Sequence, residues 1–509
     1  MARANRFSVV TSAIVALGGF LMGFDASVIS GVVGSIETQF QLSKIELGWG
    51  VASLSLSATF AMMVSGPLSD RLGRRAVLLL AATLFLLSAL ASALAPTFSL
   101  LVAARMLGGL GVGAALIIAP MYIAELAPPR VRGRLVSINQ LNIVIGISAA
   151  FFSNYLILKL GLGDNAWRWM LGVEAVPALA YVLALAFVPE SPRWLVMRDR
   201  KAEAAEVLAK AGGEKEVGAV LAAIEGSIRQ EGDKPRPPLR TLFSPGLRLA
   251  LLIGVTVGIL QQITGINAVF FYAPMIFEQS GIGTDAAFMQ AVLVGLTNLV
   301  FTIVAMVLID RLGRRLLLLG GTAGIAICMF VLAYGFSAAR YTLDSETLAE
   351  LPDTIPAAAL ERLKDRTFES DLAFREALHT ELGEAAANEH ETTLVAAAID
   401  INPTLILIAI LGFVASFAVS LGPVMWVLFS EIFPNTIRGV AISFVGLINS
   451  AVSFGVQLIF PWELATLGNA TTFLIFGGFA VLGLVIVARI LPETRGKSLE
   501  ELEAALVKA

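Results

Sequence analysis

The sequence predicts an all-α membrane protein with twelve transmembrane helices in two pseudo-symmetric six-helix halves. Of its 509 residues, 57% are hydrophobic and only 15% are charged, which is far from the balance of a soluble domain. Near-uncharged stretches of about 20 residues, enough to cross a hydrocarbon core about 30 Å thick, occur about a dozen times. The motif DRLGRR occurs twice, from Asp70 and from Asp310, which indicates two related halves.

Most of the expected spans follow one another with short connections. They are residues 8–32, 47–68, 76–95, 99–125, 135–159, 168–188, 249–277, 287–309, 315–338, 402–430, 440–461 and 469–490. The first apolar segment continues past Asp25 without a small-residue cleavage site. We therefore expect it to be kept as a helix rather than removed as a signal peptide.

The spacing of the repeat divides the chain into domains. Asp70 precedes Glu125 by 55 residues, whereas Asp310 precedes Glu431 by 121, so the second half contains an insertion of 66 residues. The inserted segment is acidic and rich in Ala and Glu, which predicts helices. The expected domains are an amino-terminal six-helix half (1–188), cytoplasmic linker helices (189–246), helices seven to nine (247–338), an acidic extracytoplasmic insert (339–401), helices ten to twelve (402–491) and a cytoplasmic tail (492–509).

Arginine and lysine cluster in alternate loops, for example at 71–75, 130–134 and 311–315. Because positively charged loops tend to stay in the cytoplasm, we expect a multi-pass protein of the plasma (inner) membrane with both termini inside and the acidic insert outside. Within the linker, residues 200–230 combine an amphipathic pattern with many charges. This pattern predicts short surface helices.

Composition and motifs exclude several function classes. Cys328 is the only cysteine, which excludes an intramolecular disulfide and a cysteine-built metal site. The membrane segments contain no grouping of nucleophile, base and orienting residue, and no metal-ligand cluster. We therefore expect neither an enzyme nor a bound cofactor or metal. We expect a monomer in the lipid bilayer, with no nucleic-acid partner.

Two charged residues fall inside expected spans, where an unpaired charge is costly and usually functional. Asp25 lies in the first helix and Arg105 near the start of the fourth, and the repeat places Gly265 and Leu411 at the equivalent positions of the second half. An arginine keeps its proton, whereas a carboxylate can be charged and paired or neutral and unpaired. Asp25 is therefore a candidate proton carrier gated by Arg105. The alternative is a permanent salt bridge between two helices.

Amide side chains in apolar surroundings are candidates for binding a neutral polyol, because one amide both donates and accepts hydrogen bonds. A tryptophan among them can stack its ring on the C–H groups of such a ligand. The candidate set is Gln140, Gln261, Gln262, Asn267, Asn298, Trp426 and Asn449. A continuous helix would place Gln262 and Asn267 about 140° apart, so we expect a helix break near Gly265. The alternative role for such amides is to bond helices to one another.

Carboxylates and arginines also gather at the expected cytoplasmic ends of both halves. Glu125 precedes Arg132 by seven residues, and Glu431 precedes Arg438 by the same spacing. With the charged DRLGRR motifs they form a candidate inner gate, closed by ion pairs that are individually weak. Its members are Asp70, Arg75, Glu125, Arg132, Asp310, Arg315, Glu431 and Arg438.

Longer motifs resemble the sugar porter family of the major facilitator superfamily. The matching segments are GGFLMGFDASVISG from Gly18, RMLGGLGVG from Arg105, PMYIAELAPPRVRGRL from Pro120, PESPRWL from Pro189, QQITGINAVFFYAP from Gln261, GPVMWVLFSEIFPNTIRG from Gly422 and PETRGKSLEELE from Pro492. The resemblance implies transport of a sugar by alternating access. It also implies that the aspartate and the arginine of the first and fourth helices couple transport to protons, and that the candidate amides and tryptophan line the sugar pocket.

Three positions differ from the bacterial xylose symporters that the chain resembles. Ile147 replaces a glutamine, Phe271 replaces a tyrosine, and Ser450 replaces the tryptophan that often follows the amide. We therefore expect a proton-coupled symporter of a hexose such as glucose. An uncoupled sugar uniporter, a pentose or inositol symporter and a non-transporting sugar sensor remain as alternatives.

Overall fold

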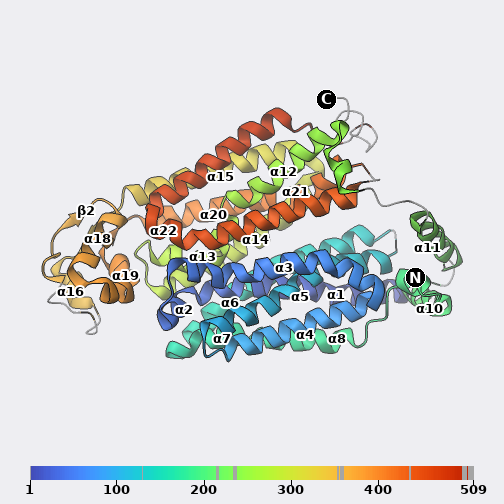
Figure 1. Cartoon of the computed structure of the whole chain (residues 1–509), viewed down its shortest axis with the longest axis horizontal. Helices are drawn as coiled ribbons and strands as arrows, with labels where there is room; N and C mark the ends of the chain where they lie inside the picture. Colours follow the sequence, from blue (N-terminus) through green and yellow to red (C-terminus); the bar gives the residue numbers. More distant parts are fainter. Residues whose placement is uncertain are drawn as a thin grey trace. The chain divides into compact units, whose positions relative to one another are not determined.

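The computed structural model describes residues 2–128, 130–213, 217–232, 238–351, 355, 360–434, 437–495 and 501. Within these residues, eleven helical stretches are long and apolar enough to cross a membrane. The last, α22 (Arg438–Ile490), has 53 residues and contains a non-helical Gly468 with φ of +77°. Phe460 and Phe476, each eight residues from Gly468, stack with ring centroids 6.1 Å apart. The chain therefore turns back at Gly468 (Figure 1), and α22 supplies two spans, which makes twelve.

The helices form two compact units. The first comprises residues 1–29, 53–153 and 165–241, and the second comprises residues 30–52, 154–164 and 242–509. Most of the first half lies in the elements α1 (Ala2–Val28), α3 (Lys44–Leu72), α4 (Arg74–Ala93), α5 (Phe98–Leu126), α6 (Arg132–Lys159), α7 (Ala166–Gly172), α8 (Ala175–Leu185), α9 (Pro192–Met197), α10 (Lys201–Gly212) and α11 (Val217–Gly232). All six spans expected in this half coincide with helices.

The second half contains α12 (Arg248–Ile263), α13 (Ile266–Glu278), α14 (Thr284–Leu312), α15 (Arg314–Ser337), α20 (Pro403–Val419), α21 (Leu421–Ile432) and α22. Two of its spans are discontinuous. The seventh breaks between α12 and α13 at Gly265, where φ is +86°. The tenth breaks between α20 and α21 at Ser420, whose φ and ψ are −122° and −96°. Broken helices expose backbone and side-chain polar groups inside a bundle, which suits a binding site.

Glycines allow helices of the first unit to touch backbone to backbone. A Cβ atom on Gly23 of α1 would lie 2.0 Å from the carbonyl oxygen of Ile143 on α6, and one on Gly146 of α6 would lie 2.0 Å from the carbonyl oxygen of Phe20. Close packing of small residues is the main source of helix association in lipid, where burial of apolar surface gives no net gain. The first and fifth spans are therefore held together by close packing of their backbones at these glycines.

The linker forms the expected surface helices. α10 and α11 cover residues 201–212 and 217–232, which is most of the predicted stretch 200–230 and two residues beyond it. The Ser8 hydroxyl of α1 donates to the carbonyl oxygen of Ala211 at 2.9 Å, in a buried position. This bond anchors α10 to the amino-terminal helix.

The second unit also contains the connection between the first two spans, which carries the short helix α2 (Val33–Phe40). The Trp49 ring contacts Phe454 edge-on with centroids 6.0 Å apart. A Cβ on Gly48 would lie 1.9 Å from the carbonyl oxygen of Leu458. The beginning of α3 therefore packs directly against the first part of α22.

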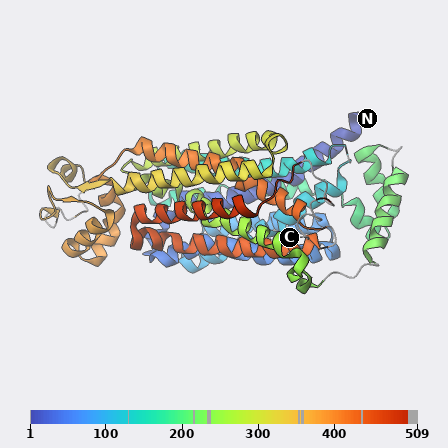
Figure 2. The ribbon, with the colours of Figure 1, turned by 90° about the horizontal axis from the view of Figure 1, so that it is seen from above.

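The insert is a small α/β unit rather than a set of helices alone, so the prediction from its composition is incomplete. Its helices are α16 (Ser345–Glu350), α18 (Asp371–Leu382) and α19 (Glu384–Ala398). Its strands β1 (Arg340–Thr342), β2 (Thr367–Phe368) and β3 (Ile399–Asp400) form an antiparallel sheet in the order β2-β1-β3. The sheet pairs the start of the insert with its end, because Arg340 lies opposite Asp400. Both views show the insert, in orange, beyond one end of α15 (Figures 1 and 2).

An aromatic core holds the insert together. Phe374 is fully buried and lies 5.7 Å from the ring centroid of Tyr341 and 5.5 Å from that of Phe368. We expect Phe374→Ala to destabilise the insert by about 3–5 kcal/mol, measured as a lower temperature at which a protease cleaves residues 339–401. Glu376→Ala, at an exposed position of the same helix, is the control. Equal protease resistance of both variants would contradict an independent core.

Candidate functional site

A buried ion pair joins α1 and α5 in the first unit. Asp25 and Arg105 are 1% and 2% exposed. The Arg105 Nη1 donates to the Asp25 carboxylate and, at 3.0 Å, to the Asp25 carbonyl oxygen. The structure thus places in contact the two charged residues that the sequence singles out.

The ion pair has unused hydrogen-bonding capacity. Within the described residues, the second carboxylate oxygen of Asp25 and the Nε of Arg105 have no hydrogen-bond partner. Gly108 makes room beside that oxygen, because a Cβ there would lie 2.4 Å from it. Buried polar atoms without partners are expensive, so this pair is poised to accept another polar group or a proton.

Glu174 is a third member of this charged cluster, and the sequence analysis overlooks it. It lies between α7 and α8, is 2% exposed and interacts electrostatically with both Asp25 and Arg105. It is the only carboxylate in the expected span 168–188, and that rarity is the signal that would have identified it. Among the described residues Arg105 forms an ion pair with Asp25 and not with Glu174. One arginine and two carboxylates have no net charge when they hold one proton.

Four amides converge at the break of the seventh span in the second unit. Because α12 ends at Ile263 and α13 begins at Ile266, Gln262 and Asn267 come close enough for the Asn267 Nδ2 to donate to Gln262 Oε1 at 2.7 Å. Gln262 Nε2 donates to Gln261 Oε1 at 3.0 Å and to Asn449 Oδ1 at 3.2 Å. Asn449 Nδ2 donates to Gln261 Oε1 at 2.9 Å. The break expected near Gly265 is therefore present, and it brings these amides together.

Two further residues of α22 extend this cluster, and the sequence analysis does not include them. The Ser453 Oγ accepts from Asn267 Nδ2 and from Gln457 Nε2, both at 2.8 Å. Serine and glutamine in an apolar helix are too common for their type alone to mark a site. Their spacing of four and eight residues from Asn449, which places all three on one face of the helix, is the only signal in the sequence.

The other candidate sugar ligands are Gln140 of the first unit and Asn298 and Trp426 of the second. Gln140 is exposed on α6 of the first unit. Asn298 on α14 is 5% exposed, and Trp426 on α21 is 43% exposed with its ring edge-on to Phe429. Within the described part of the second unit, neither Asn298 nor Trp426 is hydrogen-bonded to the four amides. The role of these three residues in sugar binding stays a prediction.

A charged cluster closes one end of the first unit. Arg74 donates to Glu125 through Nε at 3.1 Å and to Asp70 at 2.9 Å, and Ser191 also donates to Glu125. Glu190 accepts from the backbone N–H groups of Arg74 at 2.9 Å and Arg75 at 3.2 Å, which are unpaired donors in the first turn of α4. Glu125 therefore pairs with Arg74 and not with Arg132, although Arg132 is only seven residues away in the sequence.

The second unit repeats this arrangement. Arg314 lies 2.8 Å from Glu431, and Thr494 donates to Glu431 at 2.7 Å. Glu493 accepts from the backbone N–H groups of Arg314 at 3.1 Å and Arg315 at 3.2 Å. Both copies of DRLGRR therefore have the same local structure. In each, a glutamate from elsewhere in the same unit caps the helix that begins within the motif.

The remaining gate candidates occupy these same ends. Arg75 Nε donates to the carbonyl oxygen of Leu185 at 3.1 Å, and Arg315 Nη2 donates to that of Ala488 at 2.8 Å. Arg438 Nε donates to the carbonyl oxygen of Phe433 at 3.1 Å, so it does not pair with Glu431. The side chain of Asp310 lies outside the described residues. The sequence analysis does not include Glu190 and Glu493 in the candidate inner gate, although each is the second residue of a motif, PESPRWL and PETRGKSLEELE.

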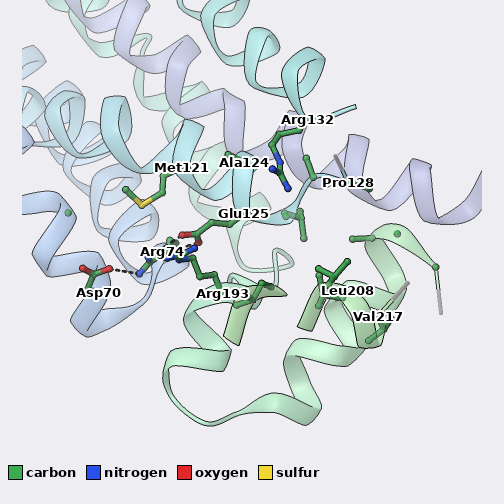
Figure 3. Close-up of a pocket in the computed structure, with 18 residues that line it drawn as sticks. Asp70, Arg74, Met121, Ala124, Glu125, Pro128, Arg132, Arg193, Leu208 and Val217 are labelled. Atoms are coloured by element: carbon green, nitrogen blue, oxygen red, sulfur yellow. Dashed lines mark hydrogen bonds and ion pairs between the residues drawn. The ribbon is translucent and has the colours of Figure 1, made fainter. Parts of the chain in front are cut away.

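A cavity of about 510 Å³ lies beside the cluster of the first unit. Figure 3 shows Arg74 between Asp70 and Glu125 on one wall, with Leu208 and Val217 of the linker helices opposite. Arg132, exposed in the first unit, also lines it. Among the described residues, no three His, Cys, Asp or Glu side chains are grouped closely enough to hold a metal ion.

Comparison with known proteins relates these features to one family. The family model described as sugar (and other) transporter matches residues 11–349 and 390–506. An arabinose-proton symporter of Bacillus subtilis (strain 168) is 34% identical over 506 residues, covering 99% of this chain and 96% of the relative. The glucose transporter GlcP of Staphylococcus epidermidis (strain ATCC 12228 / FDA PCI 1200) is 32% identical, covering 99% of this chain and 98% of the relative.

A solved structure agrees with this relationship. The inward-open conformation of the xylose transporter XylE from E. coli has a TM-score of 0.75 and 31% sequence identity, covering 97% of this chain and 98% of that chain. The family model omits residues 350–389, which lie within the insert. The protein is thus a membrane transporter and not an enzyme. The chain belongs to the sugar porter family of the major facilitator superfamily, among relatives that include sugar-proton symporters.

Proposed function

We propose that the protein carries a monosaccharide, with a hexose such as glucose favoured, together with a proton by alternating access. The observation that carries this proposal is an asymmetry between the halves. A buried cluster of one cation and two carboxylates occupies the first half, and a cluster of neutral amides occupies the second. Titratable carboxylates can bind and release a proton, whereas neutral amides can form hydrogen bonds with the hydroxyl groups of a polyol.

The proton step uses the charge balance of the first cluster. With one proton on either Asp25 or Glu174, the two carboxyl groups and Arg105 have no net charge, which is the least costly state in an apolar interior. Loss of that proton leaves a net negative charge, and only water in contact with the cluster lowers the free-energy cost of that charge enough for the proton to leave. Proton release is thereby tied to the opening of the cluster to an aqueous side.

The sugar step uses the hydrogen bonds that the amides now make to one another. Each hydrogen bond between the side-chain amides of Gln261, Gln262, Asn267 and Asn449 can be exchanged for a hydrogen bond to a sugar hydroxyl, which is both a donor and an acceptor. The exchange leaves no buried polar group without a partner, so the amides can release the sugar again. A neutral site of this kind binds without the desolvation penalty of a charge.

The preference for a hexose rests on the residues around the amides. Ser450 follows Asn449 where similar xylose symporters often have a tryptophan, and a serine occupies less volume than a tryptophan, which favours a sugar with the additional CH₂OH of a hexose. Phe271, 7% exposed on α13, lacks the hydroxyl of the tyrosine that is usual there. The names of relatives include arabinose, xylose and glucose carriers, so the residues must decide between sugars.

The test is counterflow and pH-jump uptake in proteoliposomes with glucose, galactose, xylose and inositol. The proposal expects counterflow of glucose and faster uptake when the outside is acidified. Counterflow without a pH effect would indicate a uniporter, and counterflow of xylose or inositol alone would indicate the alternative cargo. Binding of a sugar without counterflow would favour a sensor.

Glu431→Gln tests the inner gate. Because Glu431 accepts from Arg314 and Thr494, its neutral replacement should weaken the charged cluster of the second unit and slow transport about tenfold, which corresponds to about 1.4 kcal/mol. Equilibrium sugar binding should be retained. Glu206→Gln, which removes an exposed partner of Lys210, is the control. Lost binding at an unchanged protein level would contradict a gate role.

A further inference from the structure

Three polar residues follow one face of α22 beside the break of the seventh span. Asn449, Ser453 and Gln457 are spaced four residues apart, so they lie above one another on the helix. They are 6%, 8% and 1% exposed. Gln457 is the most deeply buried of the three, and Ser453 borders the amide cluster through its hydrogen bond from Asn267.

The hydrogen bonds around Ser453 fix the direction of its proton. A serine hydroxyl has two acceptor positions and one proton. Both acceptor positions are filled, one by Asn267 Nδ2 and one by Gln457 Nε2, each at 2.8 Å. The hydroxyl proton is therefore available to donate to a third group.

The neighbouring amide offers the complementary atom. Asn267 uses both of its N–H groups, one to Gln262 Oε1 at 2.7 Å and one to Ser453 Oγ at 2.8 Å. Its carbonyl oxygen Oδ1 keeps accepting capacity. A donating Ser453 hydroxyl beside an accepting Asn267 oxygen matches one sugar hydroxyl, which accepts one bond and donates another.

We propose that Gln457 is a positioning residue that holds the Ser453 hydroxyl as a donor, so that Ser453 and Asn267 together recognise one particular hydroxyl of the sugar. The backbone carbonyl oxygen of residue 457 accepts from the Tyr272 hydroxyl of α13 at 3.1 Å, and this bond does not depend on the Gln457 side chain. Tyr272 is the residue at which α13 departs from helical geometry. This inference rests on the proposed function and adds a determinant of sugar specificity to it.

The expected signature is a loss of discrimination between a sugar and one of its deoxy analogues. A site built to bond a hydroxyl rejects the analogue that lacks it, because the buried polar groups are then unpaired. Without Gln457, the Ser453 hydroxyl can turn its proton elsewhere, and the missing hydroxyl matters less. A purely structural role of Gln457 would weaken binding of all analogues equally.

The experiment uses the purified full-length protein in proteoliposomes, with glucose or xylose, whichever the wild type carries, and the monodeoxy analogues of that sugar. Gln457→Leu should raise KM for the parent sugar about three- to tenfold with kcat within about twofold. For one deoxy analogue, KM should be nearly unchanged from the wild type. Ser453→Ala, which deletes a single oxygen, should give the same pattern even if Gln457→Leu fails to fold.

The double variant and a control complete the test. Gln457→Leu with Ser453→Ala should be no worse than the weaker-binding single variant, because both act through one hydroxyl. Ser443→Ala, at an exposed position of the same helix, should behave as wild type. Additive effects, an unchanged KM, or equal losses for all analogues would overturn the inference alone. Absence of counterflow by the wild type with every monosaccharide would overturn the proposed function and this inference with it.

Discussion

Asp25→Asn is expected to abolish accumulation of sugar against a gradient while exchange of sugar between the two sides of the membrane continues. The wild-type cluster of Asp25, Arg105 and Glu174 is neutral with one proton, whereas the variant cluster is neutral with none. The asparagine cannot carry a proton. Arg105 keeps its bond to the backbone carbonyl oxygen of residue 25, which lies at 3.0 Å, so the fold should be retained.

The expected effect is large because the driving force is large. One proton moving through 100 mV supplies about 2.3 kcal/mol, which corresponds to about fiftyfold accumulation at equilibrium. In the variant this ratio should fall to one. The measurement is uptake driven by a proton gradient, compared with counterflow of the same sugar in the same proteoliposomes.

Asp285→Asn is the matched control, because it removes an exposed carboxylate that pairs with Lys159 at 2.6 Å in the second unit. It should leave both accumulation and counterflow unchanged. If Asp25→Asn left proton-driven accumulation intact, Asp25 would not be the coupling residue. If counterflow were lost with the protein still folded, the pair would serve as a permanent structural salt bridge instead.

The sequence predicts the helical framework well because the framework depends on local properties. A hydrophobic run of about 20 residues is sufficient to identify a span, and all twelve expected spans coincide with helices, including the two that meet at Gly468. The break at Gly265 is predictable as well, since polar residues at 262 and 267 cannot share a face of a continuous helix. These inferences need no knowledge of distant contacts.

The partners of the charged residues are less predictable, because they come from distant parts of the chain. Glu125 pairs with Arg74 of the preceding span, 51 positions away, rather than with the nearby Arg132. Glu190, which caps the first turn of α4, lies a further 65 positions along the sequence. Sequence spacing shows that such charges gather at one end, but only the packing of α4 against its neighbours selects the pairs.

The insert illustrates the same limit. Its strands are only two or three residues long, and β1 and β3, which pair Tyr341 with Ile399, come from opposite ends of the segment. Strands this short have no period that a sequence pattern can reveal. The Ala- and Glu-rich composition predicts the helices between these strands, but it contains no signal for the sheet.

Gly265→Ala is expected to remove most of the sugar affinity, because the break at this glycine assembles the amides. Residue 265 has φ of +86°, a conformation that costs an L-residue about 1–2 kcal/mol. A Cβ there would also lie 2.6 Å from the Phe476 ring, so the ring or the chain must shift. A seventh span pushed toward a continuous helix would separate Gln262 from Asn267 and break their 2.7 Å bond. We expect KM to rise at least about tenfold, measured by counterflow, with the proton cluster of the first unit unaffected.

Two companion variants separate the steric from the conformational contribution. Gly446→Ala adds a methyl group to a helical glycine of the same unit, where a Cβ would meet nothing within 4 Å, and should leave KM unchanged. Phe476→Ala combined with Gly265→Ala relieves the contact with the ring but not the positive φ, so it should recover only part of the affinity. Full recovery would mean that Phe476 alone requires the glycine. Unchanged affinity in Gly265→Ala would show that the amides meet without the break, and the sugar site would then have to be sought elsewhere.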